Sequence, residues 1–184
     1  MALIIDGKAI ARQMQEEMKI QVDSLAARGV VPGLAAILVG DDPASRIYVN
    51  NKEKDCQKVG IYSDVYRLPA STSEGDLIAL VDDLNRKSTI HGILIQLPLP
   101  EHIDEQKMIL RIHPDKDVDG FHPVNVGKMV IGRPGFLPCT PLGCKVLLER
   151  SKIETSGKHM VILGRSNIVG KPLANIMVQK EKGA

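Results

Sequence analysis

The sequence of 184 residues contains no tryptophan, and aromatic residues make up only 3% of it. Proteins that bind single-stranded nucleic acid stack bases on aromatic side chains, and duplex-binding proteins present a basic patch. This chain has a formal net charge of only +2 and no long block of lysine or arginine. We therefore expect no nucleic-acid partner.

Cysteines and long apolar runs are also scarce. The chain has three cysteines, Cys56, Cys139 and Cys144, whose spacing matches no zinc site and whose odd number does not suggest a disulfide framework. The five histidines are scattered, so we expect no metal site. No run approaches the roughly 20 apolar residues of a membrane span, and the first residues do not resemble a signal peptide. The sequence predicts a cytoplasmic protein with no membrane partner.

The apolar residues that are present predict alternating helices and strands. Apolar side chains at helical spacing alternate with short apolar or β-branched runs bounded by glycine, proline or polar turns. This alternation is typical of an α/β fold with a mostly parallel sheet. Helices are expected over residues 10–25, 45–59, 77–84 and 171–179 and from about 140 onward, and strands over 34–39, 61–67, 90–97 and 159–163. The polar, turn-rich segment 111–141 predicts a domain junction.

Polar residues gather where two of the predicted strands end. In parallel α/β sheets, ligands bind outside the carboxyl ends of the strands. Gln96 ends one strand, where it is either satisfied by backbone groups or directed into a site. Tyr48 and Lys52 follow another strand, on a predicted helix whose residues four apart share one face. By itself this pair is weak, because Tyr-x-x-x-Lys occurs by chance in many surface helices.

A carboxylate candidate lies in the polar turn after the third predicted strand. Asp119 could accept two parallel hydrogen bonds from a planar pair of N–H donors. Alternatively, Asp115, Asp117 and Asp119 are all solvated turn residues. A calcium loop is excluded, because no glutamate follows at the required spacing.

A second candidate site is the glycine-containing turn between the predicted strand at 159–163 and the helix at 171–179. Gly164 and Gly170 would let the backbone approach a pyrophosphate at a helix N-terminus. The spacing departs from Gly-x-Gly-x-x-Gly, so an ordinary strand-to-helix connection is an equal alternative. Arg165 and Ser166 favour a cofactor, since a guanidinium and a hydroxyl could bind a 2′-phosphate and select NADP over NAD. Arg165 could also be a surface salt-bridge partner.

Taken together, five segments resemble the bifunctional methylenetetrahydrofolate dehydrogenase/methenyltetrahydrofolate cyclohydrolase (FolD) family. The segments are 48–52, 92–100, 114–120, 138–141 and 164–172, which follow the family's order over almost the whole chain. The resemblance implies an α/β/α folate-binding catalytic domain with a mostly parallel sheet over residues 1–120. It implies, over residues 121–184, a linker and the first part of a Rossmann-type NAD(P)-binding domain.

The resemblance also implies two reactions in one-carbon metabolism, which supplies purine biosynthesis. NADP would oxidise 5,10-methylenetetrahydrofolate to the 5,10-methenyl cation, and water would open that cation to 10-formyltetrahydrofolate. Lys52 would handle the protons of the hydrolysis and Gln96 would position it, Tyr48 would pack against the folate, and Asp119 would bind the pterin. The implied substrate-binding residues are Tyr48, Gln96, Leu97, Pro98 and Asp119, and the implied cofactor-binding residues are Thr140, Gly164, Arg165, Ser166 and Gly170. A homodimer is implied as well.

The chain departs from the family in length, since only a short segment follows Gly170. A dinucleotide-binding domain needs several more strands and helices after its first turn. We therefore expect a fragment of an active enzyme, which binds NADP poorly. One alternative is a truncated, catalytically inactive folate-binding or scaffold module. Another is a short-chain dehydrogenase, but those enzymes place their glycine-rich turn before the Tyr/Lys pair rather than after it.

Overall fold

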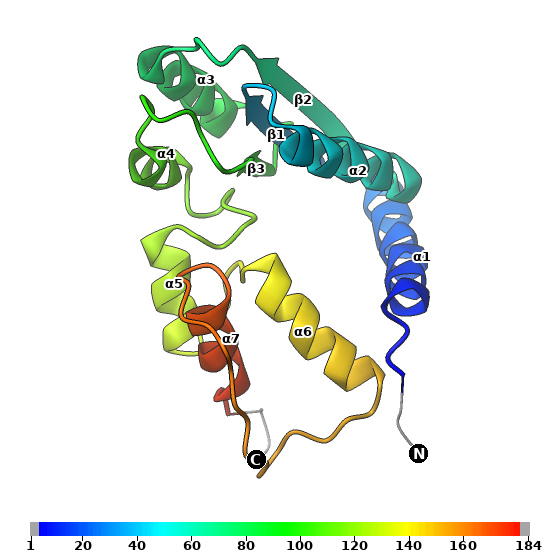
Figure 1. Ribbon diagram of the computed structural model, residues 1–184. Helices are drawn as coiled ribbons and strands as arrows, with labels where there is room; N and C mark the ends of the chain where they lie inside the picture. The colour runs from blue at the N-terminus through cyan, green and yellow to red at the C-terminus, as the bar shows by residue number, and fades with distance from the viewer. Residues whose placement is uncertain (1–3, 181–184) are drawn as a thin grey trace. The chain divides into compact units, whose positions relative to one another are not determined.

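The protein forms two compact units in a computed structural model that describes residues 4–180. One unit consists of Gln13–Val118, and the other contains the described residues before Gln13 and after Val118. Seven helices and three strands are present in the described part of the chain (Figure 1).

The unit Gln13–Val118 is built on a three-stranded parallel sheet in the order β2-β1-β3. Strand β1 (Gly33–Val39) pairs in parallel with both β2 (Tyr62–Leu68) and β3 (Gly92–Ile95). The predicted α/β fold with parallel strands is thus confirmed. Strand β3 is shorter than predicted, because the chain leaves the sheet after Ile95, just before a cis Leu97–Pro98 peptide bond.

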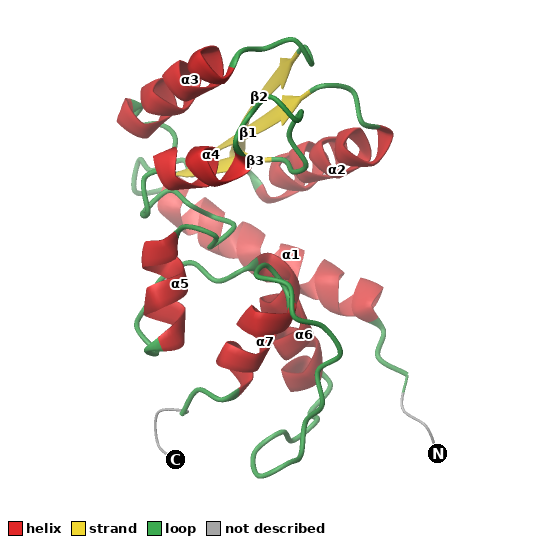
Figure 2. Ribbon diagram, turned by 60° about the vertical axis from the view of Figure 1, so that its left-hand side comes forward, coloured by secondary structure: helices red, strands yellow, loops and turns green. Residues whose placement is uncertain are grey.

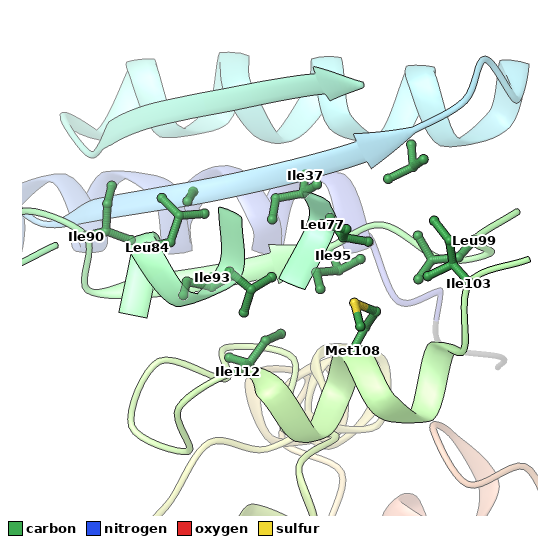
Figure 3. Close-up of a cluster of buried hydrophobic side chains, with 13 residues drawn as sticks. Ile37, Leu77, Leu84, Ile90, Ile93, Ile95, Leu99, Ile103, Met108 and Ile112 are labelled. Atoms are coloured by element: carbon green, nitrogen blue, oxygen red, sulfur yellow. The ribbon is translucent and has the colours of Figure 1, made fainter. Parts of the chain in front are cut away.

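Helices cover both faces of this sheet. Helix α2 (Pro43–Val59) lies on one face, and α3 (Glu74–Arg86) and α4 (Glu105–Arg111) lie on the other (Figure 2). Alternate residues of β1 point to opposite faces, so one set meets α3 and α4 in an aliphatic core (Figure 3). That core includes Ala35, Ile37, Val39, Leu77, Val81, Leu84 and Met108. Helix α1 (Gly7–Ala26) precedes the sheet, and Val22 is its buried residue.

Helix α2 begins where it does because Asp42 caps it. The Asp42 carboxylate accepts a 2.7 Å hydrogen bond from the Ser45 amide, and Pro43 occupies the first turn, where no N–H is needed. Hydrogen bonds from the amide and then the hydroxyl of Ser45 hold the pKa of the Asp42 carboxyl below its ordinary value. Gly60 ends the helix in the left-handed conformation. The cap fixes the point from which α2 carries Tyr48 and Lys52.

The other unit is helical in its described part, with α5 (Pro123–Val130), α6 (Cys139–Arg150) and α7 (Gly170–Met177). The prediction of a strand over 159–163 is wrong, because these residues have no regular structure. A strand requires a partner to receive its backbone hydrogen bonds, and the three strands of the described chain all lie in Gln13–Val118. Helices α4 and α5 were not predicted, although Asp104 and the His122-Pro123 pair are recognisable caps.

Ion pairs between α3 and α4 predict a loss of stability in acid. Lys107 and the Asp104 amide donate to Glu74, and Arg111 donates two hydrogen bonds to Asp82. These bonds hold the pKa of both carboxyls below their ordinary values, with Lys107 the main cause for Glu74 and Arg111 for Asp82. The stabilisation is complete above the unfolded-state pKa of about 4 and is lost as the pH falls through the lower folded-state values.

We therefore expect the free energy of unfolding, measured with urea between about pH 7 and pH 3, to fall less in a Glu74→Gln/Asp82→Asn double variant than in the unmodified chain. Equal losses in the two proteins would contradict this assignment.

Candidate active site

Lys52 of α2 and Gln96 at the end of β3 meet beyond the carboxyl edge of the sheet. Lys52 Nζ donates a 3.1 Å hydrogen bond to Gln96 Oε1, and both side chains are half-buried. Gln96 Nε2 donates in turn to the Leu97 carbonyl at 2.8 Å. The two ends of the Gln96 side chain therefore have different partners: its nitrogen bonds to a backbone carbonyl, and its oxygen faces Lys52. Because its N–H end is engaged by Leu97, the amide presents its oxygen to the amine.

Tyr48 lies one helical turn before Lys52 and is 61% exposed. Among the described residues it makes no hydrogen bond or ion pair, so its ring is open to a ligand. Val49, on the buried side of α2, is 0% exposed and anchors the helix. Leu97 is half-buried and packs against the core, whereas Pro98 is exposed. An amine, an amide and an exposed aromatic ring thus lie on or beside the same edge of one unit.

Side-chain hydrogen bonds between α2 and β2 were not predicted from the sequence. Arg67 of β2 donates to Asn50 at 3.0 Å and to Glu53 at 2.9 Å, and both acceptors flank Lys52 along α2. Exposed ion pairs of this kind contribute little stability. The two hydrogen bonds link α2 to β2 at positions on either side of Lys52. The alternation of β2, which directs Arg67 toward α2 and Tyr66 toward the core, is the signal that would have found them.

The aspartates of the polar turn differ in burial. Asp115 is exposed, Asp117 is only 2% exposed and Asp119 is half-buried. The alternative that all three are solvated turn residues is therefore wrong for Asp117. Asp119 begins the longer of the two segments that make up the other unit and is described with it. Gly120 follows with φ +66°, and a Cβ there would lie 2.9 Å from the Phe136 carbonyl oxygen, so the backbone around Asp119 is closely packed.

Lys116 holds the chain just before these aspartates. Its amine donates 2.9 Å hydrogen bonds to the carbonyls of Leu84 and Lys87 at the end of α3, a favourable place for a cation. Burial lowers the pKa of this amine below its ordinary value. The Lys116 carbonyl accepts from the Ile93 amide at 2.7 Å, which ties the turn to β3.

The turn from Gly164 to Gly170 fits tightly against the start of α7. Gly164 has φ +144°, and a Cβ on Gly170 would lie 2.4 Å from the Gly164 carbonyl oxygen, so this approach requires glycine. The Ser166 hydroxyl accepts from the amides of Val169 at 3.1 Å and Gly170 at 3.3 Å. A cavity of about 420 Å³ lies here, lined by residues 160–166 together with Val169, Gly170 and Leu173.

Arg165 is exposed, lines this cavity and forms no ion pair within the described chain, so the alternative of a surface salt bridge is wrong there. Since the Ser166 oxygen accepts from two amides, its own O–H remains to be donated to a ligand. Thr140 lies in the first turn of α6, is exposed and does not line the cavity. The structure thus brings Gly164, Arg165, Ser166 and Gly170 together without Thr140.

The histidines and cysteines make local contacts. Backbone groups bond to the rings of His91, His102, His113 and His122. The three cysteines are free, and Cys56 is buried. Over residues 4–180 no group of three His, Cys, Asp or Glu side chains could hold a metal ion, and no helix there is both long and apolar enough to cross a bilayer.

Two family models together match most of the chain. The family model described as tetrahydrofolate dehydrogenase/cyclohydrolase, catalytic domain, matches residues 5–119. The chain belongs to this family. The model of the family's NAD(P)-binding domain matches residues 138–184, which include the glycine turn.

Curated relatives of the family are longer than this chain. The bifunctional protein FolD of Halalkalibacterium halodurans is 56% identical over 179 residues, which is 97% of this chain and 64% of the relative. That of Geotalea uraniireducens is 57% identical over 180 residues, again 64% of its length. The chain therefore spans just under two thirds of these relatives.

Solved structures of the family share the fold. A bifunctional FolD dehydrogenase/cyclohydrolase from Campylobacter jejuni matches with a TM-score of 0.93 and 47% identity, over 96% of this chain and 63% of that one. A FolD from Trypanosoma brucei, complexed with NADP cofactor and an inhibitor, matches with a TM-score of 0.91 and 38% identity, over 96% and 61% of the two chains.

Proposed function

We propose that the protein acts in one-carbon folate metabolism, as an NADP-dependent methylenetetrahydrofolate dehydrogenase and methenyltetrahydrofolate cyclohydrolase. The hydrogen bond between Lys52 and Gln96 carries the proposal, because it places a proton-transferring amine and an orienting amide at the ligand-binding edge of the sheet. Family membership and the bifunctional relatives support it.

In the hydrolysis, water adds to the methenyl carbon and loses a proton, which gives a neutral carbinol. The carbinol hydroxyl then loses its proton to become the formyl oxygen as the bond from the carbon to N5 breaks and N5 takes up a proton, so one proton is released overall. Lys52 handles these protons, and Gln96, which accepts from Lys52, holds the amine in place. Tyr48 packs against one face of the folate rings, and Leu97 and Pro98 form the neighbouring side of the folate-binding site. Asp119 accepts the paired N–H donors of the pterin.

For the oxidation, bound NADP would supply the hydride acceptor for the methylene carbon. The glycine turn fits such a group. Its backbone carries no Cβ at Gly164 and Gly170, where the two ends of the turn approach each other, and a cavity of about 420 Å³ adjoins it. Gly164, Arg165, Ser166 and Gly170 would hold the cofactor, and Thr140 would approach from α6. Arg165 would bind the 2′-phosphate.

The direct test supplies the protein with 5,10-methenyltetrahydrofolate and follows hydrolysis by the loss of methenyl absorbance. Methylenetetrahydrofolate and NADP are supplied in parallel, and NADPH is measured. Hydrolysis is expected, and NADPH formation is expected to need a high NADP concentration, in keeping with the weak NADP binding expected of this chain. Folate-dependent protection against thermal unfolding without turnover would instead support a folate-binding module that lacks activity.

Replacing Arg165 with alanine should weaken NADP binding by about tenfold or more and leave NAD binding within about twofold, since a charged hydrogen bond to the 2′-phosphate is lost. Titration of the protein and its variant with each dinucleotide measures this. Arg150, which is exposed at the end of α6 and does not line the cavity, provides the matched control Arg150→Ala. Equal losses for both dinucleotides would contradict the role of Arg165.

We further propose a folate-binding catalytic domain over residues 1–120 and a linker with the NAD(P)-binding part over 121–184. The ranges matched by the two family models and the division of the chain after Val118 support this boundary. We also propose a cytoplasmic homodimer on the basis of the family resemblance. Light scattering of the purified protein would measure twice the chain mass if it is a dimer.

A further inference from the structure

A carboxylate on α4 binds the loop that follows Gln96. Glu105, the first residue of α4, accepts a 3.0 Å hydrogen bond from the Leu99 amide through Oε1. We propose that Glu105 is a positioning residue, which fixes this loop so that Gln96 presents its oxygen to Lys52. The inference rests on the function proposed above.

The loop after Leu97 has a single backbone N–H that can donate a hydrogen bond. Its sequence is Pro98-Leu99-Pro100, and proline has no N–H, so the Leu99 amide is the sole backbone donor in these three residues. The Glu105 carboxylate accepts the hydrogen bond from this amide. Because an ionised carboxylate is the acceptor, this hydrogen bond is stronger than one between neutral groups.

Three hydrogen bonds connect Glu105 to the amine. Glu105 accepts from the Leu99 amide at 3.0 Å, the Leu97 carbonyl two residues earlier accepts from Gln96 Nε2 at 2.8 Å, and Gln96 Oε1 accepts from Lys52 at 3.1 Å. The Leu97 carbonyl determines which end of the Gln96 amide faces Lys52. If the loop moves, that carbonyl moves with it, and Gln96 can turn its donor end toward a group that is itself a donor.

Glu105 is itself well placed to act as an anchor. Asp104 caps α4 by accepting from the amides of Gln106 and Lys107, and the Asp104 amide donates to Glu74 of α3 at 3.0 Å. One turn later, Met108 is 0% exposed in the core. The helix start is thus fixed from both sides. Glu105 adds a hydrogen bond to a loop that is also held by the buried Leu99 side chain and by the Pro100 carbonyl, which accepts from the Ile103 amide at 2.9 Å.

The kinetic test compares Glu105→Ala with Glu105→Gln, which keeps an oxygen acceptor. The matched control is Glu101→Ala, because Glu101 is an exposed carboxylate in the same loop region with no hydrogen bond or ion pair among the described residues. We expect Glu105→Ala to lower kcat for methenyltetrahydrofolate hydrolysis about fivefold to tenfold, with a smaller change in KM. Glu105→Gln should restore most of kcat, and the control should match the unmodified protein.

A second measurement does not depend on turnover. In ¹⁵N NMR spectra, Glu105→Ala should speed hydrogen exchange of the Leu99 amide and shift the Gln96 side-chain amide signals, while Glu105→Gln and Glu101→Ala should do neither. Unchanged Gln96 signals in Glu105→Ala, or an unchanged kcat in an active protein, would overturn the proposal. If the unmodified protein hydrolyses nothing, the proposed function fails, and the NMR comparison still decides whether Glu105 positions Gln96.

Discussion

Replacing Lys52 with methionine should lower the rate of methenyltetrahydrofolate hydrolysis by about 10²- to 10⁴-fold, the range that a positioned general acid–base group contributes. Methionine has a similar length but can neither carry a proton nor donate to Gln96, which accepts from Lys52 at 3.1 Å. Binding of NADP at the glycine turn should be unchanged, because none of the residues that line that cavity is altered. Initial rates with a saturating substrate measure the first effect, and dinucleotide titration measures the second.

Lys54→Met is the matched control. Lys54 lies on the same helix, is exposed and makes no hydrogen bond or ion pair in the described structure, so hydrolysis by this variant should stay within about twofold of the unmodified rate. If Lys52→Met retained the full hydrolysis rate, the assignment of Lys52 would be wrong.

Replacing Gly33 with alanine should lower the free energy of unfolding by about 3 kcal/mol or more, at the upper end of the effects of overpacking. The new Cβ would lie 2.0 Å from the carbonyl oxygen of Thr89, closer than the atoms can approach. Gly33 also exchanges hydrogen bonds with His91, donating to Nδ1 at 3.0 Å and accepting from the amide at 2.8 Å. The start of β1 cannot move aside without losing them.

Urea unfolding followed by circular dichroism measures this loss, with Gly75→Ala as the control. Gly75 lies in the first turn of α3 in the same unit, and a Cβ there would meet only Ser73 Oγ, at an ordinary 3.8 Å. Its replacement should leave stability unchanged or raise it by up to about 1 kcal/mol, because alanine favours a helix over glycine. Equal stability of the two variants would show that the contact with Thr89 is relieved by a small shift.

Local sequence patterns predicted much of the secondary structure of the unit Gln13–Val118. The apolar run of β1 and the helical spacing in α2 and α3 are each encoded by neighbouring residues, and these elements formed within a few residues of the expected bounds. The segment 159–163 shows the limit of such reasoning. Its composition favours a strand, but the strand's hydrogen bonds need a partner that the described part of this unit does not provide.

For the site, the order of residues is enough to establish which side chains are present and that Tyr48 and Lys52 share one helix, because helical spacing is a local property. Tertiary structure alone decided that Gln96, 44 positions further on, accepts from Lys52, and that Leu97 orients it. It also decided that Asp117 is buried, that Gly33 has no room for a Cβ and that Glu105 binds the Leu99 amide. Each of these depends on the distance between segments that only the packing of helices against the sheet brings together.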